Sequence, residues 1–463
     1  MSPHAAVAKL EASGAGEAAV ATFAEQVARV VAGERGMLAE ADLEPVASLP
    51  DADDLPPVDP ERAAELLRGA VVLKLNGGLG TSMGLAGPKS LLEVRPGTTF
   101  LDLLAAQVLH LREQTGARLP LVLMDSERTR PGSLERLAAA GIDDDGQDVP
   151  RDFLQGKVPK LRADDLEPAD WPDDPALEWA PPGHGDLYPS LVGSGMLAAL
   201  REAGYRHVFV SNVDNLGATL DPALLAWFAD SGAPFAMEVA DRTPADRKGG
   251  HLARRRDGSG LVLRELAQTP DEDSGHFQDV ERHRYFNTNN LWLDLDALDA
   301  ALREADGALA LPLILNRKTV DPRDKGSTAV LQLETAMGAA IDVWEGAEAI
   351  RVPRRRMAPV KTTDDLLALR SDAYVRTEDS RLELAPERGG RPPEVRLDGD
   401  HYKVVDDFEA RFAAGAPSLV GCDGLEVVGD VAFGADVVVR GRVRVGQEGE
   451  GQRRIADGTV LEG

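Results

Sequence analysis

Short apolar runs alternate with helical stretches through the middle of the chain, from about residue 71 to residue 374. The runs rich in β-branched residues predict buried strands at 71–75, 121–124, 208–211 and 235–240. Apolar positions at helical spacing predict helices at 100–113 and 193–203. Alternation of this kind is typical of an α/β domain, in which helices flank a mostly parallel sheet.

The chain before this pattern is of a different kind. Apolar residues recur at helical spacing between 20 and 30, and a stretch rich in Pro and Asp follows at 49–60. We therefore predict a helical N-terminal segment and linker over 1–69, and the α/β domain over 70–375. Within that domain the acidic, proline-punctuated stretch 143–174 predicts a long surface excursion, most of it outside the sheet.

Two interleaved apolar ladders with a period of six residues mark the C-terminal part of the chain. Their members are Leu419, Leu425, Val431, Val437 and Val443, and beside them Val427, Phe433, Val439 and Val445. This spacing favours a short parallel β-helix, in which each triangular coil needs three six-residue faces, over an antiparallel meander. We predict a C-terminal domain over 376–463, with a homo-oligomer contact at the exposed end of the stack.

The charge balance excludes several classes of partner. The 463 residues carry 51 Lys plus Arg against 78 Asp plus Glu, a formal net charge of −27, far from the basic surface of a nucleic-acid-binding protein. We expect no nucleic acid as partner, and no membrane, because no apolar run reaches membrane-spanning length. A single cysteine, Cys422, and the lack of an N-terminal signal pattern favour a cytoplasmic location.

The strongest chemical signal is the glycine-rich sequence VVLKLNGGLGTSMGLAGPKS at 71–90. Glycines let backbone N–H groups approach phosphate oxygens, which a Cβ would block. The loop is not a P-loop, because Pro88 stands where that motif has its second glycine, and a GxGxxG dinucleotide loop is also absent. Glycines alone are equally typical of structural turns. The rigid Pro88 before Lys89, one of only ten lysines, favours a phosphate site.

Other polar residues stand where ligands of α/β sheets bind. Asp214 follows the predicted strand at 208–211, and a carboxylate at that edge suits Mg²⁺, with a turn or helix-cap role as the alternative. Asn212 beside it offers an uncharged amide to sugar hydroxyls. The sequence FNTNNLW at 286–292 is rich in amides with aromatic flanks, which fits either sugar recognition or a ladder of Asx turns.

Three further residues carry an open choice between a ligand contact and a structural role. His184 lies between two glycines, where little local packing is available to a structural histidine. Glu265 is either an acceptor for sugar hydroxyls or an ordinary surface glutamate of a strand. Lys361 is either a solvated surface lysine or, in the extended segment after Pro359, a residue that reaches a ligand.

Seven further blocks, taken with the glycine-rich loop, resemble the eukaryotic-type UTP–glucose-1-phosphate uridylyltransferases, the UDP-glucose pyrophosphorylases, in that family's order. The blocks are PPGHGDLYPSL at 181–191, VSNVDNLGA at 210–218, KGGHL at 248–252, ELAQTP at 265–270, FNTNNLW at 286–292, LQLETAMGAAI at 331–341 and VPRRRMAPVKTTDDLLALRSDAY at 352–374. Together they span about 300 residues. The residues 81–84 differ from the GTRLG-type loop of the related UDP-N-acetylhexosamine pyrophosphorylases, which favours the glucose branch.

The resemblance implies a Rossmann-like nucleotidyltransferase fold, in which helices flank a mostly parallel mixed sheet and a short parallel left-handed β-helix follows. It implies catalytic roles for Lys89, Lys361 and Asp214, with Mg²⁺ on Asp214. The nucleotide contacts that it implies are Leu75, Asn76, Gly77, Gly78, Gly80, Met124, Gln155 and Gly183, with Met124 near the uracil and Gln155 hydrogen-bonded to it. The sugar-phosphate contacts that it implies are His184, Asn212, Gly250, Glu265, Asn287 and Asn289.

The implied reaction is reversible: UTP and α-D-glucose 1-phosphate give UDP-glucose and diphosphate. A phosphate oxygen of the sugar phosphate attacks the α-phosphorus of UTP in line. Because this nucleophile is already an anion, the site needs positioning and charge neutralisation rather than a general base. Two alternatives stay open at this point. One is a uridylyltransferase for another sugar 1-phosphate, such as galactose 1-phosphate or N-acetylglucosamine 1-phosphate, and the other is a catalytically silent nucleotide-sugar-binding protein.

Overall fold

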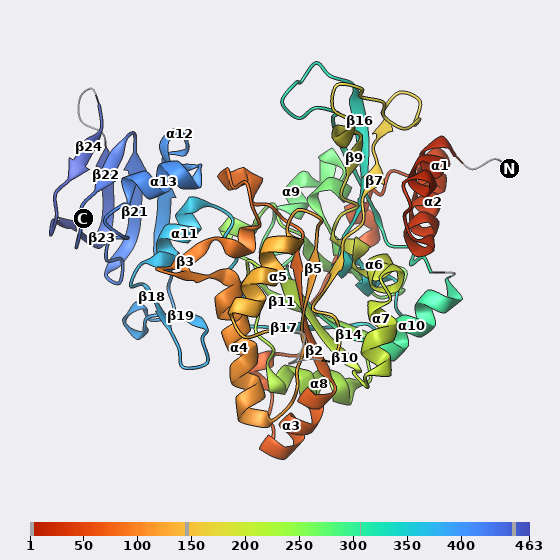
Figure 1. The fold of residues 1–463 in the computed structure, drawn as a ribbon, viewed down its shortest axis with the longest axis horizontal. Helices are drawn as coiled ribbons and strands as arrows, with labels where there is room; N and C mark the ends of the chain where they lie inside the picture. Colours follow the sequence, from red (N-terminus) through yellow and green to blue (C-terminus); the bar gives the residue numbers. More distant parts are fainter. Residues whose placement is uncertain (1–3, 144–147, 306, 447–450) are drawn as a thin grey trace.

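The computed structural model describes residues 4–143, 148–305, 307–446 and 451–463 (Figure 1). The strands are β1 Leu43–Pro45, β2 Ala70–Asn76, β3 Glu93–Arg95, β4 Thr98–Thr99, β5 Leu121–Asp125, β6 Asp152–Leu154, β7 Val158–Pro159, β8 Leu161–Arg162, β9 Trp179–Ala180, β10 His207–Asn212, β11 Phe235–Asp241, β12 His251–Arg255, β13 Leu261–Arg264, β14 Tyr285–Asp294, β15 Leu313–Thr319, β16 Ala329–Thr335, β17 Glu348–Arg351, β18 Tyr374–Arg376, β19 Leu382–Leu384, β20 Glu394–Leu397, β21 Cys422–Val428, β22 Val431–Phe433, β23 Val438–Gly446, β24 Arg453–Ile455 and β25 Val460–Glu462. The helices are α1 Ala5–Ala12, α2 Glu17–Val31, α3 Pro60–Arg68, α4 Phe100–Thr115, α5 Arg130–Ala139, α6 Leu187–Gly193, α7 Met196–Glu202, α8 Pro222–Ser231, α9 Ser274–Phe277, α10 Leu295–Glu304, α11 Thr363–Arg370, α12 Gly399–Tyr402 and α13 Val405–Arg411.

A mixed sheet, with ten strands in the described part of the chain, forms the centre of the molecule. β6, β5, β2 and β10 are parallel neighbours in that order, and β11 and β17 are a parallel pair. β14 runs antiparallel between β10 and β11, which makes the sheet mixed. The hairpin of β12 and β13, with β1 paired to β12, joins at the start of β14. The carboxyl ends of β2, β5, β10 and β11 therefore meet the start of β14 at one edge.

Helices cover both faces of this sheet, which explains why its strands are apolar almost throughout (Figure 1). Val72 on β2 packs in the cluster of buried residues that includes α3, α4 and α8. The neighbouring Val71 and Leu73 point the other way, into the cluster that includes α6, α7 and α10. Burial on both faces accounts for the continuous apolar runs that predicted β2, β5, β10 and β11.

Two features refine the sequence prediction of this domain. Asp152–Leu154, inside the predicted surface excursion, joins the main sheet as β6 because it pairs in register with the end of β5; residues 144–147 of that stretch lie outside the described residues. The helix predicted at 193–203 is present as α7, Met196–Glu202, and it begins later than predicted because Gly195 adopts a left-handed φ of 76° between α7 and the preceding α6.

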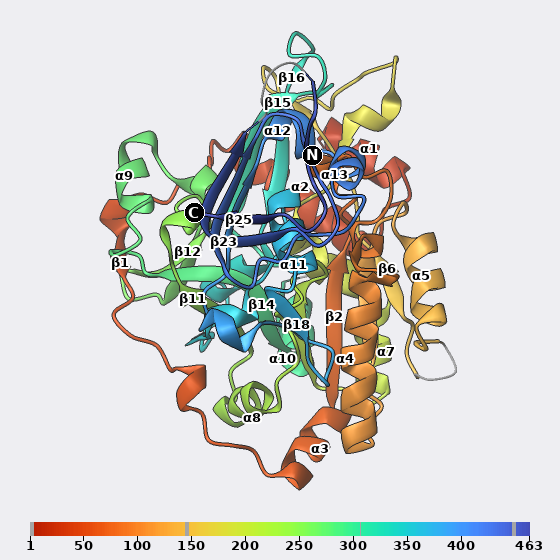
Figure 2. The ribbon, with the colours of Figure 1, turned by 90° about the vertical axis from the view of Figure 1, so that its left-hand side faces the viewer.

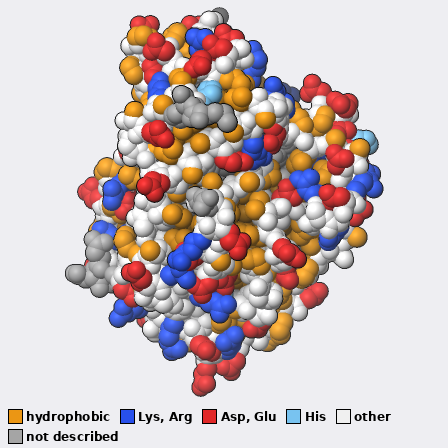
Figure 3. Space-filling model, turned by 90° about the vertical axis from the view of Figure 1, so that its right-hand side faces the viewer, with side chains coloured by type: hydrophobic (Ala, Val, Ile, Leu, Met, Phe, Trp, Pro, Cys, Tyr) orange, Lys and Arg blue, Asp and Glu red, His pale blue; other side chains and the backbone are white. Residues whose placement is uncertain are grey.

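The segment before residue 70 packs along the main domain. Phe23, Val27 and Val30 of α2 are buried against Leu313 and Leu333 of the sheet β15-β16-β8. Figure 2 shows β1 lying beside β12 at the side of the main sheet. On the face shown in Figure 3, acidic and basic side chains are interspersed among apolar ones. No helix in the described ranges is both long and apolar enough to span a bilayer.

The C-terminal sheets consist of parallel strands, β20-β21-β23-β25 and β22-β24. All nine residues of the two predicted ladders are buried. Leu425 pairs with Val443 and Val427 with Val445, so partners are three six-residue steps apart along the chain. The antiparallel meander is therefore wrong for these strands. Their apolar side chains belong to the same cluster as α4, α8 and α11.

Candidate functional site

The carboxyl ends of β2, β5 and β10 bring several predicted site residues together. Leu75 is in register with Asn212 on β10 and with Met124 on β5. The chain leaving β10 stays at this edge, because the N–H of Val213 donates to the Leu75 carbonyl at 3.1 Å. Ligands of open α/β sheets bind beyond the carboxyl ends of their strands, so the edge is the expected place for a site.

The glycine-rich loop that follows β2 folds back on itself and presents Lys89. Gly80 and Gly84 have left-handed φ angles of 61° and 73°, which side chains rarely adopt. The N–H of Lys89 donates to the carbonyl of Gly78 at 3.2 Å. Gly78 is exposed, so the loop offers backbone to a ligand at its tip.

Lys89 and Asp214 form an ion pair at the centre of this edge. The Lys89 Nζ lies 2.6 Å from Asp214 Oδ2, and the two side chains are only 14% and 18% exposed. A lysine from the loop and a carboxylate from the end of β10 thus reach the same point, which brings the two predicted segments together.

The segment that carries Lys361 is tied to the same place. The N–H of Val360 donates to the carbonyl of Asp214 at 3.2 Å. The amide of Asn215 accepts from the N–H of Ala358 at 2.9 Å and donates to the Arg356 carbonyl at 3.1 Å. Lys361 is exposed, so its ammonium group is free to reach a ligand above Asp214.

Gly250, Glu265 and Asn287 lie together where the β12–β13 hairpin meets the start of β14. A Cβ on Gly250 would stand 2.4 Å from Glu265 Oε1, so the carboxylate rests directly on the glycine. The N–H of Asn287 donates to the Gly250 carbonyl at 3.0 Å. Burial raises the pKa of Glu265 to about 7, and the nearby positive charge of Lys361 opposes that rise. Glu265 is therefore not the ordinary surface glutamate of the alternative.

The amides of the FNTNNLW sequence are partly engaged with one another. The side chain of Asn287 donates to Asn289 Oδ1 at 3.0 Å and accepts from the Asn289 N–H at 2.9 Å, an Asx-turn arrangement. Asn289 has a left-handed φ of 58°. The turn that the sequence allowed is therefore present, and it fixes these amides at the edge of the sheet; their role toward a sugar stays a prediction.

His184 is held as a neutral ring. Its Nδ1 accepts a hydrogen bond from the N–H of Met337 at 2.9 Å, which leaves the proton on Nε2. Burial lowers the pKa of His184 to about 4. The preceding Gly183 has a φ of 80°, and its missing Cβ would stand 2.4 Å from the carbonyl oxygen of Thr335. Only glycine fits this approach, which sets where the imidazole points.

Gln155 lies against the glycine-rich loop. Its Oε1 is 2.2 Å from the position that a Cβ of Gly77 would take, and its N–H donates to the Asp125 carbonyl at 2.7 Å. Its side-chain amide also lies 3.5 Å from the carbonyl of Gly183. Three segments that are distant in sequence meet at Gln155.

Two of the expected nucleotide contacts have inward-facing side chains. Met124 is only 2% exposed within the core cluster below the edge. The Asn76 amide donates to Asp125 Oδ1 and to Ser133 Oγ, both at 2.7 Å. Asn76 therefore anchors the loop from inside, and only its backbone faces the edge.

The sequence interpretation missed two buried charged groups beneath the site. Asp125 ends β5, and burial raises its pKa to about 6. Glu238 on β11 accepts two hydrogen bonds from Arg356, each 2.8 Å long, and further ones from Asn290 and Trp292. Asp125 carries the same signal that singled out Asp214, a carboxylate at the end of a predicted strand. Glu238 lies within a strand and carries no such signal.

The fold is that of an α/β protein whose polar site residues gather beyond the carboxyl ends of its parallel strands, where ligands of such sheets bind. Residues 20–440 match the family model of UTP--glucose-1-phosphate uridylyltransferase. The UTP--glucose-1-phosphate uridylyltransferases of Solanum tuberosum and Saccharomyces cerevisiae are each 42% identical, over 88% and 87% of this chain and 84% and 79% of theirs. The chain belongs to the UTP–glucose-1-phosphate uridylyltransferase family.

Solved structures of similar proteins have the same fold. A variant of the UDP-glucose pyrophosphorylase from Leishmania major, described in complex with UDP-glucose, is 46% identical with a TM-score of 0.91 over 99% of this chain and 97% of its own. A Trypanosoma brucei structure described as UDP-glucose phosphorylase is 48% identical with a TM-score of 0.89 over the same shares. The resemblance inferred from the eight sequence blocks is thereby confirmed.

Proposed function

We propose that this chain catalyses the reversible reaction of UTP with α-D-glucose 1-phosphate to UDP-glucose and diphosphate. The observation that carries the proposal is the Lys89–Asp214 pair, set between the glycine-rich loop and the Gly250–Glu265–Asn287 group. Lys89, once it turns from Asp214 to a phosphate, and the exposed Lys361 nearby supply positive charge between a phosphate loop and sugar-binding groups. This arrangement fits two anionic substrates that must meet.

The chemistry requires charge compensation and alignment. A phosphate oxygen of glucose 1-phosphate bonds to the α-phosphorus of UTP, while the bond from that phosphorus to the bridging oxygen breaks and diphosphate leaves with its electrons. Lys89 leaves Asp214 to meet the nucleotide phosphates, and Lys361 meets the sugar phosphate and the developing charge. Fixed cations of this kind stabilise the transition state, because they need little reorganisation.

The nucleotide lies along the glycine-rich loop in this proposal. Leu75, Gly77, Gly78 and Gly80 offer backbone groups to it, with Gly183 closing the site. Gln155 hydrogen-bonds the uracil, since its amide stands where three segments converge. Asn76 and Met124 support this surface from below through their buried side chains.

The sugar phosphate lies over the amide-rich start of β14. The Nε2–H of His184 donates to it, Asn287 and Asn289 offer amides to sugar hydroxyls, and Asn212 does so from the end of β10. Glu265 accepts a hydrogen bond from a sugar hydroxyl.

Asp214 suits Mg²⁺ that arrives with the nucleotide. Among the described residues no group of three or more His, Cys, Asp or Glu is arranged around a metal, and Mg²⁺ commonly takes one or two carboxylates together with substrate phosphates. The single partly exposed carboxylate of Asp214 fits that pattern. Bound there, Mg²⁺ supplies further neutralisation of phosphate charge.

A panel of sugar 1-phosphates with UTP and Mg²⁺, read as released diphosphate, tests the proposal. We expect glucose 1-phosphate to react fastest, and Lys89→Met and Lys361→Met each to lose about 10²- to 10³-fold in kcat/KM. A preference for galactose or N-acetylglucosamine 1-phosphate selects the first alternative. Binding of UDP-glucose without turnover selects the silent binding protein, and near-wild-type rates in both lysine variants refute the assignment of the site.

We also propose the finer domain organisation. The chain divides into a helical segment and linker over 1–69, a catalytic domain over 70–375 and a C-terminal domain over 376–463. The parallel pairing at intervals of three six-residue steps supports a short left-handed β-helix in the last of these. Val460 on the edge strand β25 is 48% exposed, which supports a contact between copies there. A concentration-independent monomer mass in light scattering refutes that contact.

A further inference from the structure

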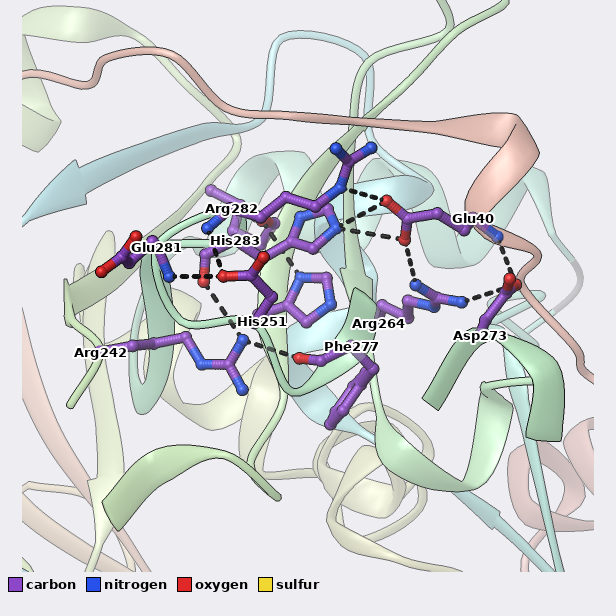
Figure 4. Close-up of polar contacts among 11 residues, drawn as sticks. Glu40, Arg242, His251, Arg264, Asp273, Phe277, Glu281, Arg282 and His283 are labelled. Carbon is purple, nitrogen blue, oxygen red and sulfur yellow. Dashed lines mark hydrogen bonds and ion pairs between the residues drawn. The ribbon is translucent and has the colours of Figure 1, made fainter. Parts of the chain in front are cut away.

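Charged residues and histidines gather around Glu40 (Figure 4). Two of them, His251 and Arg264, belong to the β12–β13 hairpin, next to Gly250 and Glu265 of the proposed sugar site. We call this cluster the Glu40 network. It consists of Glu40, Arg242, His251, Arg264, Asp273, Arg282 and His283. None of these residues belongs to the site expected from the sequence blocks, and the proposed reaction uses none of them directly.

Glu40 is the centre of this network. Its Oε2 accepts from Arg264 Nη1 at 2.6 Å and its Oε1 from Arg282 Nε at 2.7 Å. The ring of His283 lies 3.1 Å from the same carboxylate. Glu40 is 7% exposed and Arg264 is fully buried. A buried guanidinium needs carboxylate partners. Arg264 has two, Glu40 at 2.6 Å and Asp273 at 3.2 Å, and Glu40 is the closer, so Glu40 contributes most to fixing where the Arg264 side chain lies.

Glu40 comes from the N-terminal segment, and the backbone holds it firmly. Residues 38–45 form a strap over the β12–β13 hairpin. The N–H of Leu38 donates to the Gln268 carbonyl at 2.7 Å, and the N–H of Glu40 donates to Asp273 at 2.6 Å. Beyond Glu40, Leu43 pairs with Arg255 on β12. Backbone hydrogen bonds thus hold the strap on both sides of Glu40.

The network and the sugar site share one backbone. His251 and Arg264 are direct partners across the hairpin, and their side chains lie in the network. Successive residues of a strand point to opposite faces. Gly250, which precedes His251, and Glu265, which follows Arg264, therefore face the sugar site.

His251 and His283 also connect the Glu40 network to the start of β14. The rings of His251 and His283 stack with centroids 4.0 Å apart. His251 also pairs with Phe286, the residue before Asn287. The network therefore contacts, from behind, each of the three segments that supply Gly250, Glu265 and Asn287.

We propose that Glu40 is a positioning residue for the sugar phosphate: through Arg264 and His283 it sets the place of Glu265, Gly250 and Asn287, while the nucleotide side of the site does not depend on it. This inference rests on the proposed function. The nucleotide loop follows β2, and Met124 and Gln155 come from β5 and from the chain just after β6. In the described part of the chain, the hydrogen bonds and ion pairs of the Glu40 network reach no residue of these strands. Changing Glu40 is therefore expected to alter KM for glucose 1-phosphate and not KM for UTP.

Steady-state kinetics of Glu40→Gln, with the second substrate saturating, tests the proposal. We expect KM for glucose 1-phosphate to rise about tenfold and KM for UTP to stay within about twofold. Glu44→Gln is the matched control, because Glu44 lies on the same strap and its carboxylate has no ion pair among the described residues. An equal change in both KM values, or no change in either, overturns the proposal.

A charge-balanced variant separates positioning from stability. Glu40→Gln leaves the buried Arg264 with Asp273 as its remaining carboxylate, at 3.2 Å, and leaves Arg282 without the Glu40 carboxylate. The variant is therefore expected to lower the unfolding temperature. Adding Arg282→Gln, at a site 35% exposed, removes one unmatched charge and raises that temperature, but Arg264 still lacks Glu40 and keeps only Asp273. We expect KM for glucose 1-phosphate to stay high in the double variant and to be normal in Arg282→Gln alone. A KM that recovers together with the unfolding temperature overturns the proposal.

If Glu40→Gln alone does not fold, the variant that combines Glu40→Gln with Arg282→Gln tests the positioning role of Glu40. Failure of the proposed function is a separate outcome, since the unchanged protein would then not release diphosphate from UTP and glucose 1-phosphate. In that case a binding measurement with UDP-glucose replaces the kinetics, and weaker binding in the double variant than in Arg282→Gln supports the positioning role. Equal binding by the two overturns it.

Discussion

Replacing Gly250 with alanine tests how closely the sugar site is packed. A Cβ there would stand 2.4, 2.6 and 2.7 Å from Oε1, Cδ and Oε2 of Glu265. Ordinary contact begins at 3.4 Å, so the carboxylate must retreat by about 1 Å. Gly250 has no positive φ, so the backbone itself is not strained by the change. A misplacement of about 1 Å costs about 10²-fold, or roughly 2.7 kcal/mol.

The assay is diphosphate release with each substrate varied in turn. We expect kcat/KM for glucose 1-phosphate to fall about 10- to 100-fold in Gly250→Ala, and KM for UTP to change by less than about twofold. Gly275→Ala is the control, because a Cβ at Gly275 meets no atom within 4 Å and its φ is not positive. The control separates the effect of a methyl group as such from the clash with Glu265.

A double-mutant cycle with Glu265→Ala isolates the contact. If the clash with the carboxylate is the cause, Gly250→Ala adds less than about 0.5 kcal/mol once that carboxylate is gone. A full additional loss in the Glu265→Ala background would refute the reasoning, and so would an unchanged kcat/KM for glucose 1-phosphate in the single variant.

Two further predictions concern the buried charges beneath the site. Burial raises the pKa of Asp125 from 3.8 to about 6. The folded state therefore binds the carboxyl proton of Asp125 more tightly than the unfolded state does. This proton's contribution to the free energy of unfolding is complete below pH 3.8 and is lost as pH rises through 6. Asp125→Asn should match the unchanged protein near pH 4 in urea unfolding and exceed it at pH 8 by about 2–3 kcal/mol, and equal stabilities at pH 8 would contradict this. Glu238→Gln leaves the buried Arg356 guanidinium without its counterion and should cost about 3–5 kcal/mol in urea unfolding. Glu426→Gln, which removes an exposed pair with Arg444, should change stability by less than about 1 kcal/mol, and equal losses in the two variants would argue against the buried-pair explanation.

The parts of the fold that could be predicted are those where a local pattern decides the structure. β2, β5, β10 and β11 are buried on both faces, so their apolar runs are continuous and visible in the sequence. Every member of the six-residue ladders is buried and therefore apolar. The repeat is for that reason visible in the sequence, and it predicted parallel strands. β6 escaped the prediction, since three residues with a polar start join the sheet only through pairing with β5.

Some features of the candidate site could also be predicted from local sequence, and others could not. Lys89 and Asp214 each come after a predicted strand, and the carboxyl ends of parallel strands meet at one edge of a sheet, so both residues could be expected at the same edge. The inward turn of the Asn76 side chain could not, because it depends on Asp125 and Ser133, which are 49 and 57 residues away. Glu40 gave no signal at all, since its charge is matched by residues more than 200 positions later.

The strap that carries Glu40 also constrains the order of folding. It is synthesised early, yet its carboxylate meets Arg264, Arg282 and His283 across 224, 242 and 243 residues. Contacts of such separation carry a large loop-closure entropy and form late. During synthesis the strap therefore stays unpaired until the ribosome has released β12, β13 and the start of β14, and its docking completes the assembly of this side of the molecule.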